Sequence, residues 1–377
     1  MKKITFITEN QLSNNDKIKF GFNYYSKKVK LEKINISALT KPEYFNYIKN
    51  SKIKGNVKFI YNFQELKKKV IHERKSIFIC NFANLSSSSS NVLKILNDNQ
   101  INYILINSGQ LSKYKIKKLE YLYFFLRYPL FTFKKIIHYF YKKTFTRFIP
   151  VKIFSSNYEE IKKNKKLIYI PSYDYDYYLN KKKNLKKDHN TEYCVFLDTP
   201  QSHPDGMFTK LRYPPETPCN VENYYGPLNK FMKIHQKKIK VKILPHPRST
   251  KKDINYLHFG EKSYKEKLQL IYNSNYVLTF GSAAISLAIL LNKPIVFLTH
   301  NKLTYHNRRN IETLSSELNS TLLDIGKYDK KNFDNFSINK VDKKKYEKFK
   351  KKYIGKHISL KSYEIIYKEL FLKNDCK

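Results

Sequence analysis

Three segments in the second half of the chain hold polar residues of the kinds that bind phosphate groups or react at a sugar carbon. The first is CVFLDTPQSHPDG, in which Asp198 comes directly after an apolar run and is followed by His203. A carboxylate just beyond a strand is a candidate nucleophile or base, and a nearby imidazole is a candidate acid or base. The alternative is an Asx-turn that leaves the strand, and it is at least as good for Asp205, which precedes a glycine. We therefore predict catalytic roles for Asp198 and His203.

The second segment is VKILPHPRS, where His246 lies between two prolines and is followed by Arg248. Each proline fixes its own backbone φ angle, so the imidazole is held in place. A histidine N–H and a forked guanidinium both suit phosphate oxygens. A lone His-Pro pair is more typical of a rigid surface turn. The spacing from this pair to the third segment, described next, favours a binding role for His246.

The third segment is VLTFGSAAISLAILLNKP, in which a strand-like run meets Gly281 and Ser282 and then a helical run. The first turn of a helix presents unpaired N–H groups and the positive end of the helix dipole, so it favours an anion. Ser282 adds a hydroxyl, and the small Ala283 lets a ligand come close. The alternative is a turn that only packs the helix on the sheet, but the chain has just nine glycines, which makes this one informative. No GxGxxG or Walker pattern occurs, so a single phosphate is the expected ligand.

Short β-branched or aromatic runs alternate with helical patterns along the chain, which is typical of βαβ units and parallel sheets. The predicted strands are Ile4–Thr8, Val57–Tyr61, Ser76–Cys80, Tyr103–Asn107, Val151–Phe154, Tyr193–Leu197, Lys240–Leu244, Tyr276–Thr279 and Pro294–Leu298. The predicted helices cover 222–235, 263–272, 283–291 and a charged tail at 341–373. Since ligands of such sheets bind beyond the carboxyl ends of the strands, the three segments are expected to meet at one sheet edge.

A lysine-rich break, NKKKNLKKDHN at 180–190, predicts two α/β domains with a cleft between them. Residues 1–185 would form an acceptor-side Rossmann-like domain, and residues 186–377 a nucleotide-binding Rossmann-like domain that ends in C-terminal helices. On the acceptor side, Asn107, Gly109 and Gln110 follow a predicted strand, although an ordinary turn explains them equally well. Glu9 and Asn10, after the first strand, have the same standing.

The composition limits the function classes. Lys and Arg number 73 against 31 Asp and Glu, giving a formal charge of +42, and 41% of residues are apolar. So much apolar surface excludes a disordered polyelectrolyte, while the charge predicts attraction to anionic ligands or surfaces. Part of that charge is a lysine-for-arginine composition bias, since only seven residues are Arg. Four cysteines without CxxC spacing predict neither disulfides nor zinc, and the N-terminus lacks a signal-peptide core, so we expect a cytoplasmic protein.

Residues 121–148, YLYFFLRYPLFTFKKIIHYFYKKTFTRF, are aromatic and basic throughout. They fit core helices and a helix lying on an anionic bilayer equally well.

Together the three segments and a YY-containing helix resemble bacterial GT-B glycosyltransferases that use CMP-activated ulosonic acids. The likeness covers about 190–300 and is closest to retaining β-Kdo transferases of lipopolysaccharide and capsule synthesis, with looser similarity to bacterial sialyltransferases. It implies a GT-B-like fold and an Asp198 that forms a covalent glycosyl adduct. It also implies a CMP-sugar site made of His246, Pro247, Arg248, Gly281, Ser282, Ala283 and Ser286.

The expected function is the transfer of a 2-keto acid sugar, Kdo or another ulosonic acid, from CMP to a surface-polysaccharide acceptor. Retention of configuration through Asp198, no metal cofactor, a glycan or lipid-linked saccharide acceptor, and a peripheral position on the inner face of the cytoplasmic membrane are expected with it. The alternative within the same class is an inverting, sialyltransferase-like CMP-nonulosonate transferase. Asp174 and Asp176 also allow a DxD metal site for a nucleotide diphosphate. A nucleic-acid binder and a membrane scaffold are the non-enzyme alternatives; spread-out lysines and missing RNA-binding motifs argue against nucleic acid.

Overall fold

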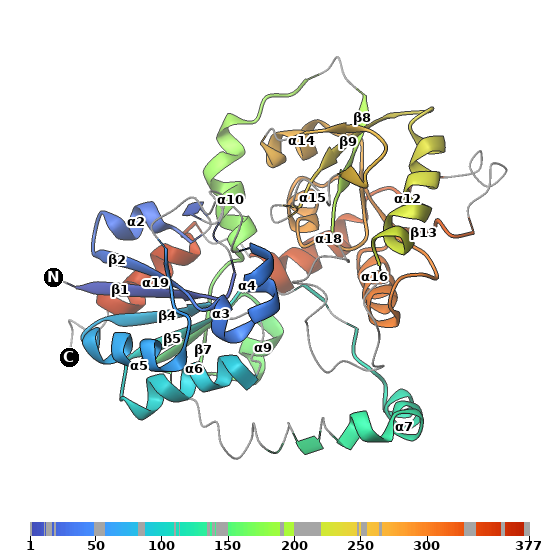
Figure 1. The fold of residues 1–377 in the computed structure, drawn as a ribbon. Coiled ribbons are helices and arrows are strands. Elements are labelled where there is room, and N and C mark those ends of the chain that lie inside the picture. The colour runs from blue at the N-terminus through green and yellow to red at the C-terminus, as the bar shows by residue number, and fades with distance from the viewer. Residues whose placement is uncertain are drawn as a thin grey trace. The chain divides into compact units, whose positions relative to one another are not determined.

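The computed structural model of the chain contains two parallel β-sheets with helices around each (Figure 1). It describes residues 2–10, 12, 17–18, 20–48, 57–81, 87–108, 111–112, 114–133, 136–137, 140, 150–188, 192–199, 220–246, 249, 255–263, 266–327, 337–355 and 359–372. The chain divides into two compact units. The first comprises 1–110, 128–176 and 355–377, and the second comprises 111–127 and 177–354.

The sheet of the first unit has seven strands in the order β3-β2-β1-β4-β5-β6-β7, and every neighbouring pair is parallel. Its strands are β1 (Lys3–Thr8), β2 (Lys30–Asn35), β3 (Lys58–Phe59), β4 (Ile77–Asn81), β5 (Tyr103–Asn107), β6 (Lys152–Ser155) and β7 (Leu167–Tyr169). The order reverses between β1 and β4, as in a doubly wound Rossmann sheet. All five strands predicted in this half are present, whereas β2 and β7 were not predicted.

The sheet of the second unit has six parallel strands in the order β10-β9-β8-β11-β12-β13. Its strands are β8 (Tyr193–Leu197), β9 (Lys240–Leu244), β10 (Glu261–Lys262), β11 (Val277–Thr279), β12 (Ile295–Thr299) and β13 (Thr321–Asp324). The order reverses between β8 and β11, so this unit is also Rossmann-like. The four strands predicted here are confirmed to within one residue at each end.

Helices cover both sheets (Figure 1). The first unit carries α2 (Phe22–Ser26), α3 (Ser37–Thr40), α4 (Pro42–Ile48), α5 (Phe63–His72), α6 (Ser87–Asp98), α9 (Tyr158–Lys163) and α19 (Ser362–Phe371). The second carries α7 (Lys118–Arg127), η1 (Lys182–Asn184), α12 (Val221–His235), α14 (Lys267–Asn273), α15 (Ile285–Leu290), α16 (Tyr305–Leu318), α18 (Lys343–Phe349) and the π-helical η2 (Lys350–Ile354). Helix α10 (Tyr173–Lys181) begins in the first unit and ends in the second.

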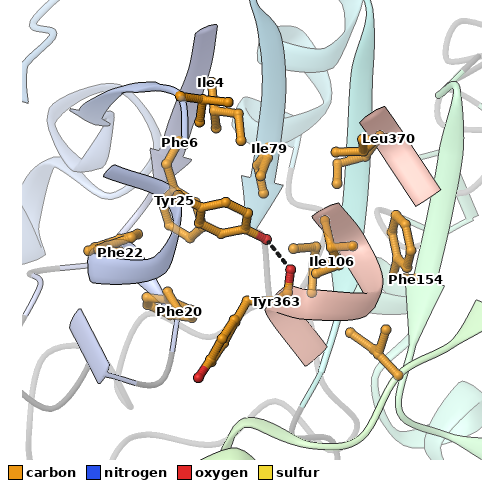
Figure 2. Close-up of a cluster of buried hydrophobic side chains, with 14 of the residues drawn as sticks. Ile4, Phe6, Phe20, Phe22, Tyr25, Ile79, Ile106, Phe154, Tyr363 and Leu370 are labelled. Carbon is orange, nitrogen blue, oxygen red and sulfur yellow. Dashed lines mark hydrogen bonds between the residues drawn. The ribbon is translucent and has the colours of Figure 1, made fainter. Parts of the chain in front are cut away.

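The C-terminal helix α19 belongs to the core of the first unit. Its apolar side chains pack with residues of β1, β4, β5 and β6, and the Tyr25 hydroxyl donates to the carbonyl of Tyr363 at 3.2 Å (Figure 2). The buried carboxylate of Asp176 accepts hydrogen bonds from the backbone N–H and the hydroxyl of Ser362. The predicted division into 1–185 and 186–377 differs from this arrangement, because the chain returns to its first sheet after completing the second unit.

The lysine-rich break is bound to the second unit rather than free of contacts. The backbone N–H of Lys186 donates to Gln269 at 3.1 Å, and that of Asp188 donates to Asn273 at 3.2 Å. Both acceptors lie on α14. Repulsion within the lysine run therefore does not prevent an ordered path along this helix.

Candidate functional site

The strand register of the second sheet brings the ends of three strands to one level. Leu197 of β8 pairs with Leu244 of β9 on one side and with Thr279 of β11 on the other. The residues that follow are Asp198, the 245–249 loop and the Gly281 turn. These segments therefore meet at the switch point between β8 and β11, which confirms the predicted grouping of the described residues.

Asp198 is 2% exposed, and its carboxylate connects two of these segments. One oxygen, Oδ2, lies 3.4 Å from the backbone nitrogen of His246 and 3.3 Å from the Ser249 hydroxyl, both donors. The other, Oδ1, lies 3.5 Å from the Tyr225 hydroxyl. The 245–249 loop is itself turned by a hydrogen bond from the N–H of Ser249 to the carbonyl of His246. Asp198 thus orients the loop that presents His246, a role that the sequence did not indicate.

Helix α12 supports the same edge with two adjacent tyrosines. Its N-cap Asn220 accepts from the N–H of Asn223, which fixes the start of the helix. The Tyr224 hydroxyl then donates to the carbonyl of Thr199 at 2.6 Å, next to the Asp198 contact of Tyr225. The spacing of its apolar and aromatic residues is typical of one helix face, and these residues are all buried: Tyr224, Tyr225, Leu228, Phe231 and Met232.

The Gly281 turn is built from hydrogen bonds between its own residues. Gly281 has a φ angle of 88°, which an L side chain rarely adopts. The Thr279 hydroxyl accepts from the N–H of Ser282 at 3.0 Å, and the Ser282 hydroxyl accepts from the N–H of Ala284 at 3.4 Å. The Ser286 hydroxyl donates to the carbonyl of Ala283. Ser282 is buried, whereas Ala283 is exposed.

The helix after this turn is shorter than predicted. α15 covers only Ile285–Leu290, because residues 283–284 form a turn and Leu291 ends the helix. Because α15 has only six residues, its dipole is weaker than that of the predicted helix over 283–291. What the segment offers a ligand is a small-residue turn with serine hydroxyls.

A further residue at this edge was missed by the sequence analysis. His300 follows β12 and is 1% exposed, and its ring lies edge-on to Phe280 with centroids 5.6 Å apart. Neither ring nitrogen has a hydrogen-bond partner among the described residues. Burial lowers the pKa of His300 to about 4, so the imidazole is neutral near pH 7. Its position two residues after the predicted strand Pro294–Leu298 was the available signal.

In the first unit, the structure favours Glu9 over the predicted acceptor-side residues. Asn107 donates its side-chain amide to Glu160 at 3.0 Å, which joins β5 to α9. Glu9 follows β1 at the switch point of its own sheet and is 3% exposed. Its carboxylate accepts from the Ser89 hydroxyl on α6 and lies 3.8 Å from the Lys41 ammonium. It is a buried carboxylate at the place where such sheets bind ligands.

Five predicted site residues lie outside the described part of the chain. They are Gly109, Gln110, His203, Pro247 and Arg248. Their predicted roles stay predictions.

No group of three or more metal-binding side chains occurs among the described residues. Asp174 and Asp176 both lie in the first turn of α10, and two positions on a helix point about 200° apart. Asp176 is moreover bonded to Ser362. The helix therefore does not direct these two carboxylates at one ion.

Comparison with known proteins shows similarity of fold. No family model matches the sequence, and no curated protein matches it. The Staphylococcus aureus MnaA–UDP co-structure aligns with a TM-score of 0.52 and 11% identity, over 99% of this chain and 97% of its own. The Methanocaldococcus jannaschii UDP-GlcNAc 2-epimerase, in complex with UDP-GlcNAc and UDP, aligns with a TM-score of 0.51 and 14% identity. That alignment covers 98% of this chain and 99% of the epimerase. Together with the two doubly wound sheets, these alignments show that the chain has a GT-B-like α/β fold.

Proposed function

We propose that the chain is a glycosyltransferase that takes a 2-keto acid sugar from a CMP donor and transfers it to a glycan or lipid-linked acceptor. The observation that carries the proposal is the meeting of Asp198, His246 and Ser282 at the switch point of the second sheet. The motif likeness to CMP-ulosonic acid transferases falls on these same residues. A GT-B-like fold supports a sugar-nucleotide substrate.

The donor would be held by its single phosphate. In this proposal His246 and the Gly281–Ser282 turn bind the phosphate, and Asp198 fixes the loop that carries His246. Hydrogen-bond donors placed where the leaving phosphate gains charge stabilise the transition state. The cationic chain also suits the carboxylate of a 2-keto acid sugar.

The chemical step is a double displacement at the anomeric carbon. An Asp198 oxygen forms a bond to that carbon while the bond to the phosphate oxygen breaks, and CMP leaves with the electron pair. An acceptor hydroxyl then displaces Asp198 and gives its proton to a base, so that two inversions retain the configuration.

A second candidate is a UDP-sugar enzyme. Two of the similar structures are complexes with UDP, and one of these is a UDP-GlcNAc 2-epimerase. CMP and UDP are both pyrimidine nucleotides, so a site at this edge of the second sheet does not by itself distinguish between them. The number of phosphate groups that the site binds distinguishes them.

The test is calorimetric titration of the full chain with CMP, UDP and UMP. We expect CMP to bind most tightly, and Ser282→Ala to weaken CMP binding about tenfold through a lost hydrogen bond. Asn107→Ala, in the first unit, is the matched control and should leave CMP affinity unchanged. Tighter binding of UDP would overturn the CMP assignment, and equal CMP affinity in Ser282→Ala would remove the turn from the donor site.

A further inference from the structure

Helix α7 exposes an apolar face. Leu119 is 81% exposed, Leu126 is 71% and Leu122 is 57%. Spacings of three and four place these leucines on one side of the helix, and Phe125 lies beside them at 48% exposure. Exposed large apolar residues continue along the chain at Leu130, Phe133, Ile136, Ile137 and Phe140. A run of this kind marks an interaction surface rather than chance exposure.

The opposite side of α7 is fixed to α16 within the second unit. Phe124 is the buried residue of α7, and its ring lies edge-on to that of Tyr305 with centroids 5.7 Å apart. The Glu120 carboxylate accepts from the Tyr305 hydroxyl at 3.0 Å and lies 3.8 Å from the Arg309 guanidinium. The exposed leucines are therefore held outward by a fixed attachment, not by fraying of the helix.

The charges around this face indicate which partner fits it. Lys115, Lys117, Lys118 and Arg127 are all exposed. The single acidic residue of 111–148 is Glu120, which is engaged on the α16 side. Leucines flanked by lysines match a bilayer with anionic headgroups, because the leucines enter the acyl boundary while the ammonium groups reach the phosphates.

We propose that the α7 face, defined by Leu119, Leu122, Phe125 and Leu126 with Lys115, Lys117, Lys118 and Arg127 around it, docks the protein on an anionic lipid surface. No described helix is long and apolar enough to span a membrane. In this proposal the contact is interfacial, with α7 lying along the surface and its leucines entering the acyl boundary. It would place the enzyme where lipid-linked acceptors are found, but the docking itself does not depend on the proposed function.

The absence of tryptophan from the chain allows a direct test of insertion. Leu122→Trp puts a single fluorophore on the α7 face of the full-length protein. We expect its emission to shift to shorter wavelength on adding phosphatidylglycerol vesicles and to be quenched by brominated lipid. Leu322→Trp is the matched control, because Leu322 is a 42% exposed leucine on β13 of the same unit, and it should show neither effect.

A second measurement separates docking from general charge attraction, since a chain of net charge +42 binds anionic vesicles non-specifically. Leu119→Ser, Leu122→Ser and Leu126→Ser together should lower co-sedimentation with these vesicles at least about tenfold. Leu322→Ser should bind as the unaltered chain does. High salt should weaken the binding of the unaltered chain, and neutral vesicles should bind it at least about tenfold less.

Three outcomes would overturn the proposal. One is an unchanged emission spectrum for Leu122→Trp with vesicles. Another is equal vesicle binding by the triple-serine variant and by Leu322→Ser. The third is a dimer that the triple-serine variant dissociates while its vesicle binding stays unaltered, which would assign the α7 face to contact between copies of the chain.

Discussion

Asp198 combines two roles in the proposed mechanism, and they can be separated by substitution. Its Oδ2 orients the 245–249 loop, and its carboxylate attacks the sugar. Asp198→Asn keeps the size of the side chain but is a poor nucleophile, so we expect turnover to fall at least about a thousandfold. CMP affinity should change by less than about tenfold, because an amide oxygen still accepts a hydrogen bond from the loop.

Mass spectrometry distinguishes the mechanisms that Asp198 could serve. Incubation of the unaltered protein with donor alone should give an adduct one sugar heavier, on a peptide containing Asp198. A base in an inverting enzyme never bonds to the sugar, so turnover without any adduct and with an inverted product would assign Asp198 to that role. Full activity in Asp198→Asn would remove it from catalysis.

His300 and His235 form a matched pair for testing how a buried imidazole without a hydrogen-bond partner changes the free energy of unfolding. Both are buried in the second unit with a pKa lowered to about 4 by burial. His235 bonds to the Tyr276 hydroxyl at 2.8 Å, whereas His300 has no partner among the described residues. At about pH 7.5, His300→Leu should raise the free energy of unfolding by about 1–3 kcal/mol. His235→Leu should lower it, because Tyr276 loses its partner.

The pH dependence of the same variants follows from the lowered pKa. Between about pH 6.5 and pH 4 the unfolded chain binds a proton that folded His300 does not, so stability is lost as the pH falls through this range. His300→Leu should make that decline shallower. Urea unfolding at several pH values measures both effects, and a decline as steep as in the unaltered chain would contradict the assignment to His300.

At the scale of elements, α19 is joined to α10 by a titratable contact. Burial raises the pKa of Asp176 to about 7, against opposing hydrogen bonds from Ser362. Between about pH 4 and pH 7 the folded protein binds a proton that the unfolded chain does not. The contribution of Asp176 to stability is therefore largest at low pH and is lost as the pH rises to about 7.

Asp176→Asn should remove this loss and keep an oxygen acceptor for the N–H of Ser362. We expect the variant to gain stability relative to the unaltered chain between about pH 5 and pH 8, measured by denaturant unfolding. A difference that does not change with pH would mean that Asp176 keeps its charge in the folded protein.

The strands that the sequence predicted are those whose own residues form an apolar or β-branched run. Central strands such as β8 are apolar runs and were located to the residue. β2, KLEKIN, was missed because its charged residues interrupt the apolar run expected of a strand. One of these charges is paired across the sheet, since Glu32 lies 2.9 Å from Lys3 of the adjacent β1. At the site, Asp198 and Glu9 were both named because they come directly after predicted strands, but only burial and the contacts with Ser89 and Lys41 set Glu9 apart. His300 was missed, because only its burial distinguishes it.

At the scale of the whole molecule, the first unit contains both the N-terminal part of the chain and the C-terminal helix α19, because α19 packs on the first sheet. Tyr363, Ile366, Leu370 and Phe371 are all buried there, and Gly21 leaves no room for a side chain beside Tyr363. Burying each large apolar side chain contributes about 1.5–3 kcal/mol. Their sum is comparable to the whole stability of a typical domain, about 5–15 kcal/mol. The spacing of apolar residues in α19 predicts a helix with one buried face, but it does not indicate on which of the two sheets that face packs.

A chain that ends at residue 355 should therefore unfold the first unit and spare the second. Limited proteolysis with peptide mapping should then cut 2–110 early, while 220–354 resists and CMP binding persists. Deleting only 373–377 is the control, since it keeps the whole of α19, and should leave the cleavage pattern unchanged. If residues 186–377 instead folded as one domain, as the sequence alone predicts, the shortened chain would lose protection in 220–354 and keep it in 2–110. The two arrangements thus predict early cleavage in different parts of the chain, 2–110 in the first case and 220–354 in the second.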